Sequence, residues 1–197
     1  GEALFGGDMM ARLAAAAKDG GAAAIRANSP QDIAAIKKAL ELPVIGLWKR
    51  HFDDSDVYIT PRIADVLDVA AAGADIVALD ATLRPRPGGE RLSDIVRQAK
   101  ERTDCLLMAD VSTVEEGLHA AEIGFDLVST TLSGYTPYSP QSEQPDFELI
   151  AALSGKLDIP VFAEGRLQTP EQALRCLELG AYAVVVGTAI TRPQVTT

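Results

Sequence analysis

Three ionisable side chains stand directly after apolar runs that have the composition of buried strands. Lys49 follows the run that begins at Val44, Asp110 ends the run LLMAD, and Glu164 ends the run VFAE. A lysine and two carboxylates are groups that can move protons at carbon. Arg26 ends a further run, AAAIR, and a cation of this kind stabilises a developing enolate. The pattern therefore indicates acid–base chemistry at a carbon atom.

The expected fold would give these residues a common place. In barrels of parallel strands, the side chains at the carboxyl ends of the strands build the site. For each residue the alternative is a structural ion pair that braces the barrel, such as Lys49 with Glu164. Asp80 and Thr131 end two more apolar runs. We expect Asp80 to contact substrate, although it could simply cap a turn.

Seven apolar runs with strand character alternate with seven segments of helical periodicity. This alternation predicts a parallel sheet, and a strand spacing of roughly 20–35 residues favours a closed (β/α)8 TIM barrel over an open sheet. We expect a single α/β domain over residues 1–197, with the first strand and the last helix missing from these residues. Thr60 and Thr169 each precede a proline and are predicted to cap helices. The expected strands are 22–26, 44–48, 75–79, 105–109, 126–131, 159–163 and 182–186.

The last two expected strands end in turns that contain glycine. Gly165 and Arg166 follow the sixth run, and Gly187 and Thr188 follow the seventh. In (β/α)8 barrels the loops after the last two strands often bind a phosphate through backbone N–H groups. Arg192 would add positive charge nearby. We therefore predict phosphate binding by these five residues, and the alternative is two ordinary glycine turns.

The composition argues against several classes of partner. The formal net charge of −10 is the opposite of what nucleic acid selects, and no apolar run approaches the ~20 residues of a membrane span. No secretory leader is visible, so a cytoplasmic location is the default expectation. Asp53, Asp54 and Asp56 resemble the start of a calcium loop, but the glycine and distal glutamate that such a loop needs are absent. Without a metal-binding histidine pair or a Walker loop, the chemistry is expected to need no cofactor or metal.

Several longer stretches carry a resemblance to a known family. GGAAAIRA, GLWKR-x-FDDSDVYITP, ADVSTVEEG, DLVSTTLSGYTPYS, AEGR-x-x-TPEQA and VVVGTAITRPQ together resemble the N-acetylmannosamine-6-phosphate 2-epimerase family of sialic acid catabolism. The resemblance implies a phosphate-binding (β/α)8 barrel that interconverts N-acetylmannosamine 6-phosphate and N-acetylglucosamine 6-phosphate without metal or nucleotide. The last helix of this family often takes part in dimer contacts, so a homodimer is one expectation.

The resemblance also implies roles for particular residues. The catalytic lysine and glutamate of the family fall on Lys49 and Glu164, and its acidic partner falls on Asp110. Its substrate-contacting arginines fall on Arg26 and Arg192. We also assign Tyr135, in the STTLSGYT block, to substrate binding. Two other readings stay open: a decarboxylase or synthase on another sugar phosphate, and a non-catalytic sugar-phosphate sensor.

Overall fold

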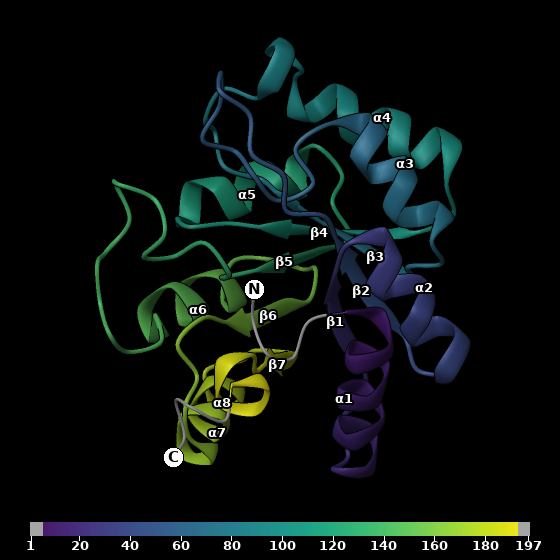
Figure 1. Cartoon of the computed structure of the whole chain (residues 1–197). Coiled ribbons are helices and arrows are strands. Elements are labelled where there is room, and N and C mark those ends of the chain that lie inside the picture. The colour runs from purple at the N-terminus through teal and green to yellow at the C-terminus, as the bar shows by residue number, and fades with distance from the viewer. Residues whose placement is uncertain (1–5, 193–197) are drawn as a thin grey trace. The chain divides into compact units, whose positions relative to one another are not determined.

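The computed structural model describes residues 6–192, in which strands and helices alternate along the chain (Figure 1). The described chain divides into two compact units. The first unit runs to Leu79 and also takes in Arg84–Leu107. The second unit consists of Asp80–Leu83 and the chain from Met108 onward. Each unit is described by itself.

The first unit contains three parallel strands in chain order. Ile25 pairs with Val44 at the start of β1 and β2, and Ile45 pairs with Ile76 of β3. The helices α1 and α2 lie side by side (Figure 1). The elements are α1 (Gly7–Asp19), β1 (Ile25–Asn28), α2 (Pro30–Ala39), β2 (Val44–Leu47), α3 (Ile63–Ala71), β3 (Ile76–Asp80), the 3-10 helix η1 (Pro87–Gly89) and α4 (Leu92–Arg102).

Helices cover β2 so closely that one of its residues has to be glycine. All four residues of β2 are buried. A Cβ atom at Gly46 would lie only 2.7–2.8 Å from side-chain atoms of Ala74, Ile33 and Val69. An unbroken buried strand of this kind is typical of parallel sheets that are covered by helices. The close packing fixes the end of β2, where Lys49 follows.

The second unit contains four parallel strands in chain order. Met108 pairs with Leu127, Val128 with Val161, and Phe162 with Ala183. The elements are β4 (Leu106–Asp110), α5 (Val114–Glu122), β5 (Leu127–Ser129), α6 (Phe147–Ser154), β6 (Val161–Glu164), α7 (Pro170–Glu178), β7 (Ala183–Val185) and α8 (Thr188–Thr191). The unit boundary cuts β3 before Asp80 and β4 before Met108.

The core behind the end of β6 is apolar. Buried Ile150, Ala163, Leu167, Cys176 and Ala181 form one cluster, against which Phe147, Leu179, Val184 and Val186 pack. Cys176 is fully buried, and this burial raises the pKa of its thiol. The seven predicted strands are all present, although most begin or end a few residues away from the expected bounds. The short helix α8 directly follows the glycine turn at Gly187.

Candidate active site

Two carboxylates gather with two hydroxyls where strands of the second unit end. Asp110 is the last residue of β4, Ser129 ends β5, and Glu164 ends β6. The parallel register sets Asp110 beside Ser129. Thr131 follows β5 by two residues, so that its side chain lies on the same face as that of Ser129. The sequence thus places four polar side chains at one strand edge, and the structure brings them into contact.

The Thr131 hydroxyl lies between the two carboxylates. Its Oγ1 atom is 2.8 Å from Oδ1 of Asp110 and 3.0 Å from Oε2 of Glu164. The Ser129 hydroxyl lies 2.8 Å from the Thr131 hydroxyl and 3.4 Å from Oε2 of Glu164. Asp110 is fully buried, whereas Glu164 is partly exposed. We call Asp110, Ser129, Thr131 and Glu164 the carboxylate cluster.

The backbone of Glu164 is fixed by the neighbouring threonine. The Thr130 hydroxyl donates to the carbonyl of Glu164 at 2.9 Å, and it accepts from the Glu164 N–H at 3.1 Å. Thr130 and Thr131 therefore hold the main chain and the side chain of the same glutamate. The sequence identified Glu164 by its position after an apolar run, but it did not indicate this double anchor.

Asp80 is also part of this unit, and it is buried next to the end of β4. Its Oδ1 atom accepts from the N–H of Thr82 at 3.0 Å and from the Thr82 hydroxyl at 2.6 Å. The N–H of Ala81 donates to the carbonyl of Asp110 at 2.8 Å. Asp80 therefore caps the turn after β3, which is the alternative that the sequence left open. A substrate contact of Asp80 stays a prediction.

The two glycine turns leave open space beside their backbones. Gly165 has φ 110°, in the region that favours glycine, and a Cβ atom there would meet only the carbonyl of Thr131 at 4.0 Å. At Gly187 a Cβ atom would have no neighbour within 4 Å. Thr188 opens α8, and Arg192 follows it with an exposed side chain. An anion could approach either backbone closely, as the predicted phosphate site requires.

Arg166 is bound to the long loop between β5 and α6. It donates from Nη1 to the carbonyl of Ser133 at 2.8 Å and from Nε to the carbonyl of Gln144 at 2.9 Å. Its guanidinium also lies over the ring of Tyr135, 5.8 Å from the centroid. Tyr135 is 56% exposed. Two residues that the sequence assigned to substrate binding therefore contact each other, and Arg166 anchors the loop.

A buried glutamate holds the same loop from another side. Glu116 in α5 accepts from the Tyr138 hydroxyl at 2.6 Å and from the Ser112 hydroxyl at 2.8 Å. The Thr136 hydroxyl lies 3.0 Å from the Ser112 hydroxyl. These contacts order a segment that the sequence gave no reason to expect as fixed. Local sequence carries no signal for a partner 22 residues away.

In the first unit, the backbone of Lys49 is held from two sides. Its N–H donates to Oδ1 of Asn28, at the end of β1, at 2.8 Å. Lys49 also forms an antiparallel bridge with Ile59. The returning segment is fixed by Thr60, which donates through its hydroxyl to the carbonyl of Ala78 at 2.7 Å. The exposed lysine side chain thus starts from a rigid point.

The neighbouring arginines have different surroundings. Arg26 lies in β1, opposite Ile45. Arg50 donates from Nη1 to Oδ1 of the fully buried Asp65 at 2.8 Å, and its guanidinium lies 4.7 Å from the centre of the Trp48 ring. The ion pair between Arg50 and Asp65 braces the segment that follows Lys49.

Within residues 6–192, no group of three or more His, Cys, Asp or Glu side chains could hold a metal ion. Asp54, from the acidic run of the sequence, instead accepts from the N–H of Gly88 at 2.9 Å. In the described part of the chain no helix has the length and apolarity needed to cross a bilayer.

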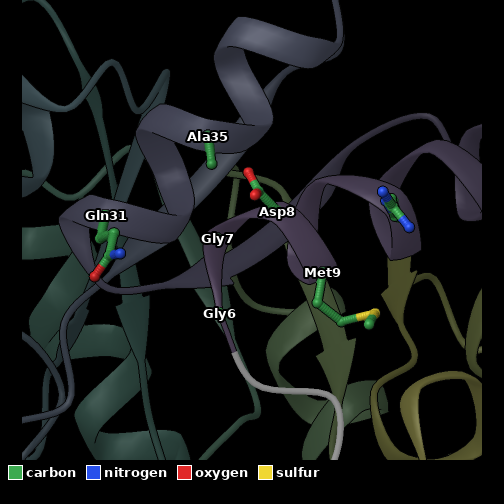
Figure 2. A pocket seen from close by; sticks show the side chains of 7 residues that line it. Gly6, Gly7, Asp8, Met9, Gln31 and Ala35 are labelled. Atoms are coloured by element: carbon green, nitrogen blue, oxygen red, sulfur yellow. The ribbon is translucent and has the colours of Figure 1, made fainter.

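A cavity of about 530 Å³ lies in the first unit, between the start of α1 and α2. Figure 2 shows that it is lined by the start of α1, with Gly7, Asp8 and Met9, and by Gln31 and Ala35 of α2. It contains none of the residues that the sequence assigned to the reaction. The cavity therefore adds nothing to the candidate active site.

Parallel strands alternating with helices, with acids and hydroxyls where the strands end, define this protein as a (β/α)8-barrel enzyme. The predicted fold is confirmed by a solved structure, whose title describes the N-acetylmannosamine-6-phosphate 2-epimerase from Clostridium perfringens. The two structures have a TM-score of 0.96 and 51% sequence identity, over 99% of this chain and 85% of that one. The chain belongs to the family described as "Putative N-acetylmannosamine-6-phosphate epimerase", whose profile matches residues 10–197. The resemblance stated from the sequence is thereby confirmed.

Two curated relatives agree with this family. A protein of Caldanaerobacter subterraneus, named "Putative N-acetylmannosamine-6-phosphate 2-epimerase", is 55% identical over 195 residues, which are 98% of this chain and 82% of the relative. A protein of Clostridium perfringens strain SM101 with the same name is 53% identical over 195 residues, or 98% of this chain and 87% of the relative.

Proposed function

We propose that this protein interconverts N-acetylmannosamine 6-phosphate and N-acetylglucosamine 6-phosphate, as an isomerase of amino-sugar catabolism that needs no cofactor. The observation that carries the proposal is the carboxylate cluster, in which Asp110 and Glu164 share the hydroxyl of Thr131. Such a pair can deliver and accept protons at sugar oxygens. Family membership supports the same reaction.

Epimerisation at C2 requires an open sugar chain, in which C1 is an aldehyde and the C2 proton is acidic. In the proposed reaction Glu164 and Asp110 handle the protons of ring opening and of the hydroxyls. Lys49 removes or returns the C2 proton, and Arg26 holds the substrate while charge develops on the enolate oxygen. The new proton reaches the opposite face of C2 from a second group, after rotation about C1–C2, or by a relay through the substrate.

The phosphate of the substrate is proposed to bind at the two glycine turns. Open space beside Gly165 and Gly187 supports this assignment, because phosphate binding by backbone N–H groups needs close approach. Thr188, Arg192 and Arg166 would contribute side-chain donors, and Asp80 and Tyr135 would contact the sugar. We further propose one barrel domain over residues 1–197 and a cytoplasmic location. We also propose a homodimer, and sedimentation at several protein concentrations would test this oligomeric state.

Proton NMR in D2O tests the reaction directly. N-acetylmannosamine 6-phosphate is incubated with the full chain and no added metal, and the C2 proton signal is followed. Loss of that signal together with growth of N-acetylglucosamine 6-phosphate is the expected result. Exchange without product would mean that the proton returns to one face only. Neither exchange nor product, with folded protein, would contradict the epimerase and favour a sensor or another sugar-phosphate enzyme.

A further inference from the structure

The three oxygen neighbours of Thr131 Oγ1 set a constraint on the protons of the carboxylate cluster. The hydroxyl oxygen lies within 3.0 Å of Asp110 Oδ1, Glu164 Oε2 and Ser129 Oγ. A threonine hydroxyl has one proton to donate and two lone pairs with which to accept. It can therefore make a linear hydrogen bond as donor to only one of these three oxygens.

Counting the protons shows that this arrangement favours one protonated carboxyl group over two ionised carboxylates. If Thr131 donates to Asp110, Glu164 faces a lone pair of the hydroxyl, and their contact is attractive only if Glu164 carries a proton. If Thr131 donates to Glu164, Asp110 needs the proton instead. If Thr131 donates to Ser129, both acids need one. Each arrangement leaves at least one carboxylic acid beside Thr131, whatever other partners the two acids have.

We propose that Thr131 is a positioning residue that keeps one of the two acids protonated and passes that proton between Asp110 and Glu164. When Glu164 gives its proton to Thr131 Oγ1, the hydroxyl gives its own proton to Asp110. Glu164 becomes a carboxylate, Asp110 becomes a neutral acid, and Thr131 is unchanged. Both the number of protons and the net charge are conserved.

The relay suits the proposed function, on which its kinetic part rests. Ring opening needs an acid for the ring oxygen and a base for the C1 hydroxyl, and ring closure on the product needs the reverse. A pair that holds one proton supplies one acid and one base at the same time. Ring opening leaves the pair in the reversed state that ring closure uses, so transfer through Thr131 would act before each turnover, by placing the proton on the acid that faces the ring oxygen.

The kinetic test compares Thr131→Val, which keeps the shape but removes the hydroxyl, with Thr131→Ser, which keeps the hydroxyl. We expect Thr131→Val to lower kcat by about 10- to 100-fold, with KM within about threefold of wild type. Thr131→Ser should keep kcat within about threefold, because its hydroxyl can take the same contacts. Equal loss in both variants, or full activity in Thr131→Val, would overturn the relay.

Infrared spectroscopy tests the proton itself and needs no turnover. A protonated carboxyl absorbs apart from a carboxylate, so the difference spectrum between wild type and Glu164→Gln at neutral pH reports the acid of the cluster. We expect a carboxylic-acid band in wild type and Thr131→Ser that is lost or shifted in Thr131→Val. If Thr131→Val does not fold, the difference spectra of wild type against Glu164→Gln and against Asp110→Asn test the proposal by themselves, through the presence or absence of a carboxylic-acid band.

The two measurements separate this inference from the proposed function. If wild type shows the acid band but does not epimerise the sugar phosphate, the proposed function fails and the shared proton stands. If wild type is an active epimerase and no difference spectrum contains a carboxylic-acid band, the shared proton is wrong and the function stands.

Discussion

The guanidinium of Arg166 occupies the space in which a side chain at residue 134 would lie. A Cβ atom at Gly134 would collide with Nη1 of Arg166, the same nitrogen that donates to the carbonyl of Ser133 at 2.8 Å. Gly134 also has φ 77°, a conformation that L side chains rarely adopt. The glycine and the arginine are therefore interdependent in ordering the loop between β5 and α6.

Gly134→Ala should destabilise the protein by about 1–3 kcal/mol, because the alanine is strained and displaces Arg166. Urea denaturation gives the free energy of unfolding. Gly155→Ala is the matched control, since Gly155 has a right-handed backbone with φ −82°. In an Arg166→Ala background the Gly134→Ala change should cost less. Equal stability of the Gly134 and Gly155 variants would contradict this account.

Lys49→Ala should lower kcat by about 10²–10⁴-fold, the range for loss of an acid–base group. Exchange of the substrate C2 proton in D2O should fall by the same factor, because that step is assigned to the lysine. Lys156→Ala removes an exposed lysine in the turn after α6 and serves as the control. Wild-type exchange in Lys49→Ala would remove the lysine from the proposed chemical step.

Arg192→Ala should raise KM by roughly 10- to 100-fold with a smaller effect on kcat, as expected when a charged hydrogen bond to the phosphate is lost. Steady-state kinetics over a range of substrate concentrations separates the two parameters. Arg175→Ala is the control, because Arg175 lies exposed on α7 and pairs with Glu178. A drop in kcat at unchanged KM would mean that Arg192 acts in the chemical step.

The lowered pKa of Asp75 predicts that this residue contributes to stability in a way that depends on pH. Burial alone would raise its pKa, but hydrogen bonds from the Lys37 amine and from the N–H of Val44 outweigh burial, and the pKa is lowered from 3.8. A lowered folded-state pKa stabilises the protein above the unfolded value, and the gain is lost as pH falls through the folded value.

Asp75→Asn should therefore lower the free energy of unfolding at pH 7 by less than about 1 kcal/mol, because solvent screens this half-exposed pair. The difference from wild type should shrink as pH falls below about 4 and vanish below the lowered folded-state pKa. Denaturant titrations at several pH values measure it, with the exposed Asp158→Asn as control. A difference that grows on acidification would contradict the assignment.

Helix caps show how far local sequence predicts this fold. Thr169 was expected to cap a helix, and its hydroxyl does accept from the N–H of Gln172 at 3.3 Å. The same expectation for Thr60 is wrong, because α3 begins only at Ile63. The Thr60 hydroxyl instead accepts from the N–H of Trp48 and donates to Ala78. These partners lie 12 and 18 residues away, where a local pattern carries no information.

In the candidate site, too, some residues could be predicted from local sequence and others could not. Asp110 and Glu164 could be found from the sequence because hydrophobic runs mark strands and parallel strands end on one edge. The position of the Thr131 hydroxyl between them depends on side-chain conformations from three strands. The ion pair between Arg50 and Asp65 likewise joins residues 15 positions apart. Such contacts follow from packing and leave no periodic signal.

The double anchoring of the Lys49 backbone makes this position suitable for chemical rebuilding. In Lys49→Cys the sulfur would start along the path of the natural side chain, since Asn28 and Ile59 hold the main chain in place. Alkylation with 2-bromoethylamine would then extend it to a lysine analogue with sulfur in place of one methylene. Cys105 and Cys176 should react slowly, because burial raises the pKa of both thiols. An inactive protein could thus regain its amine, and its turnover, after folding is complete.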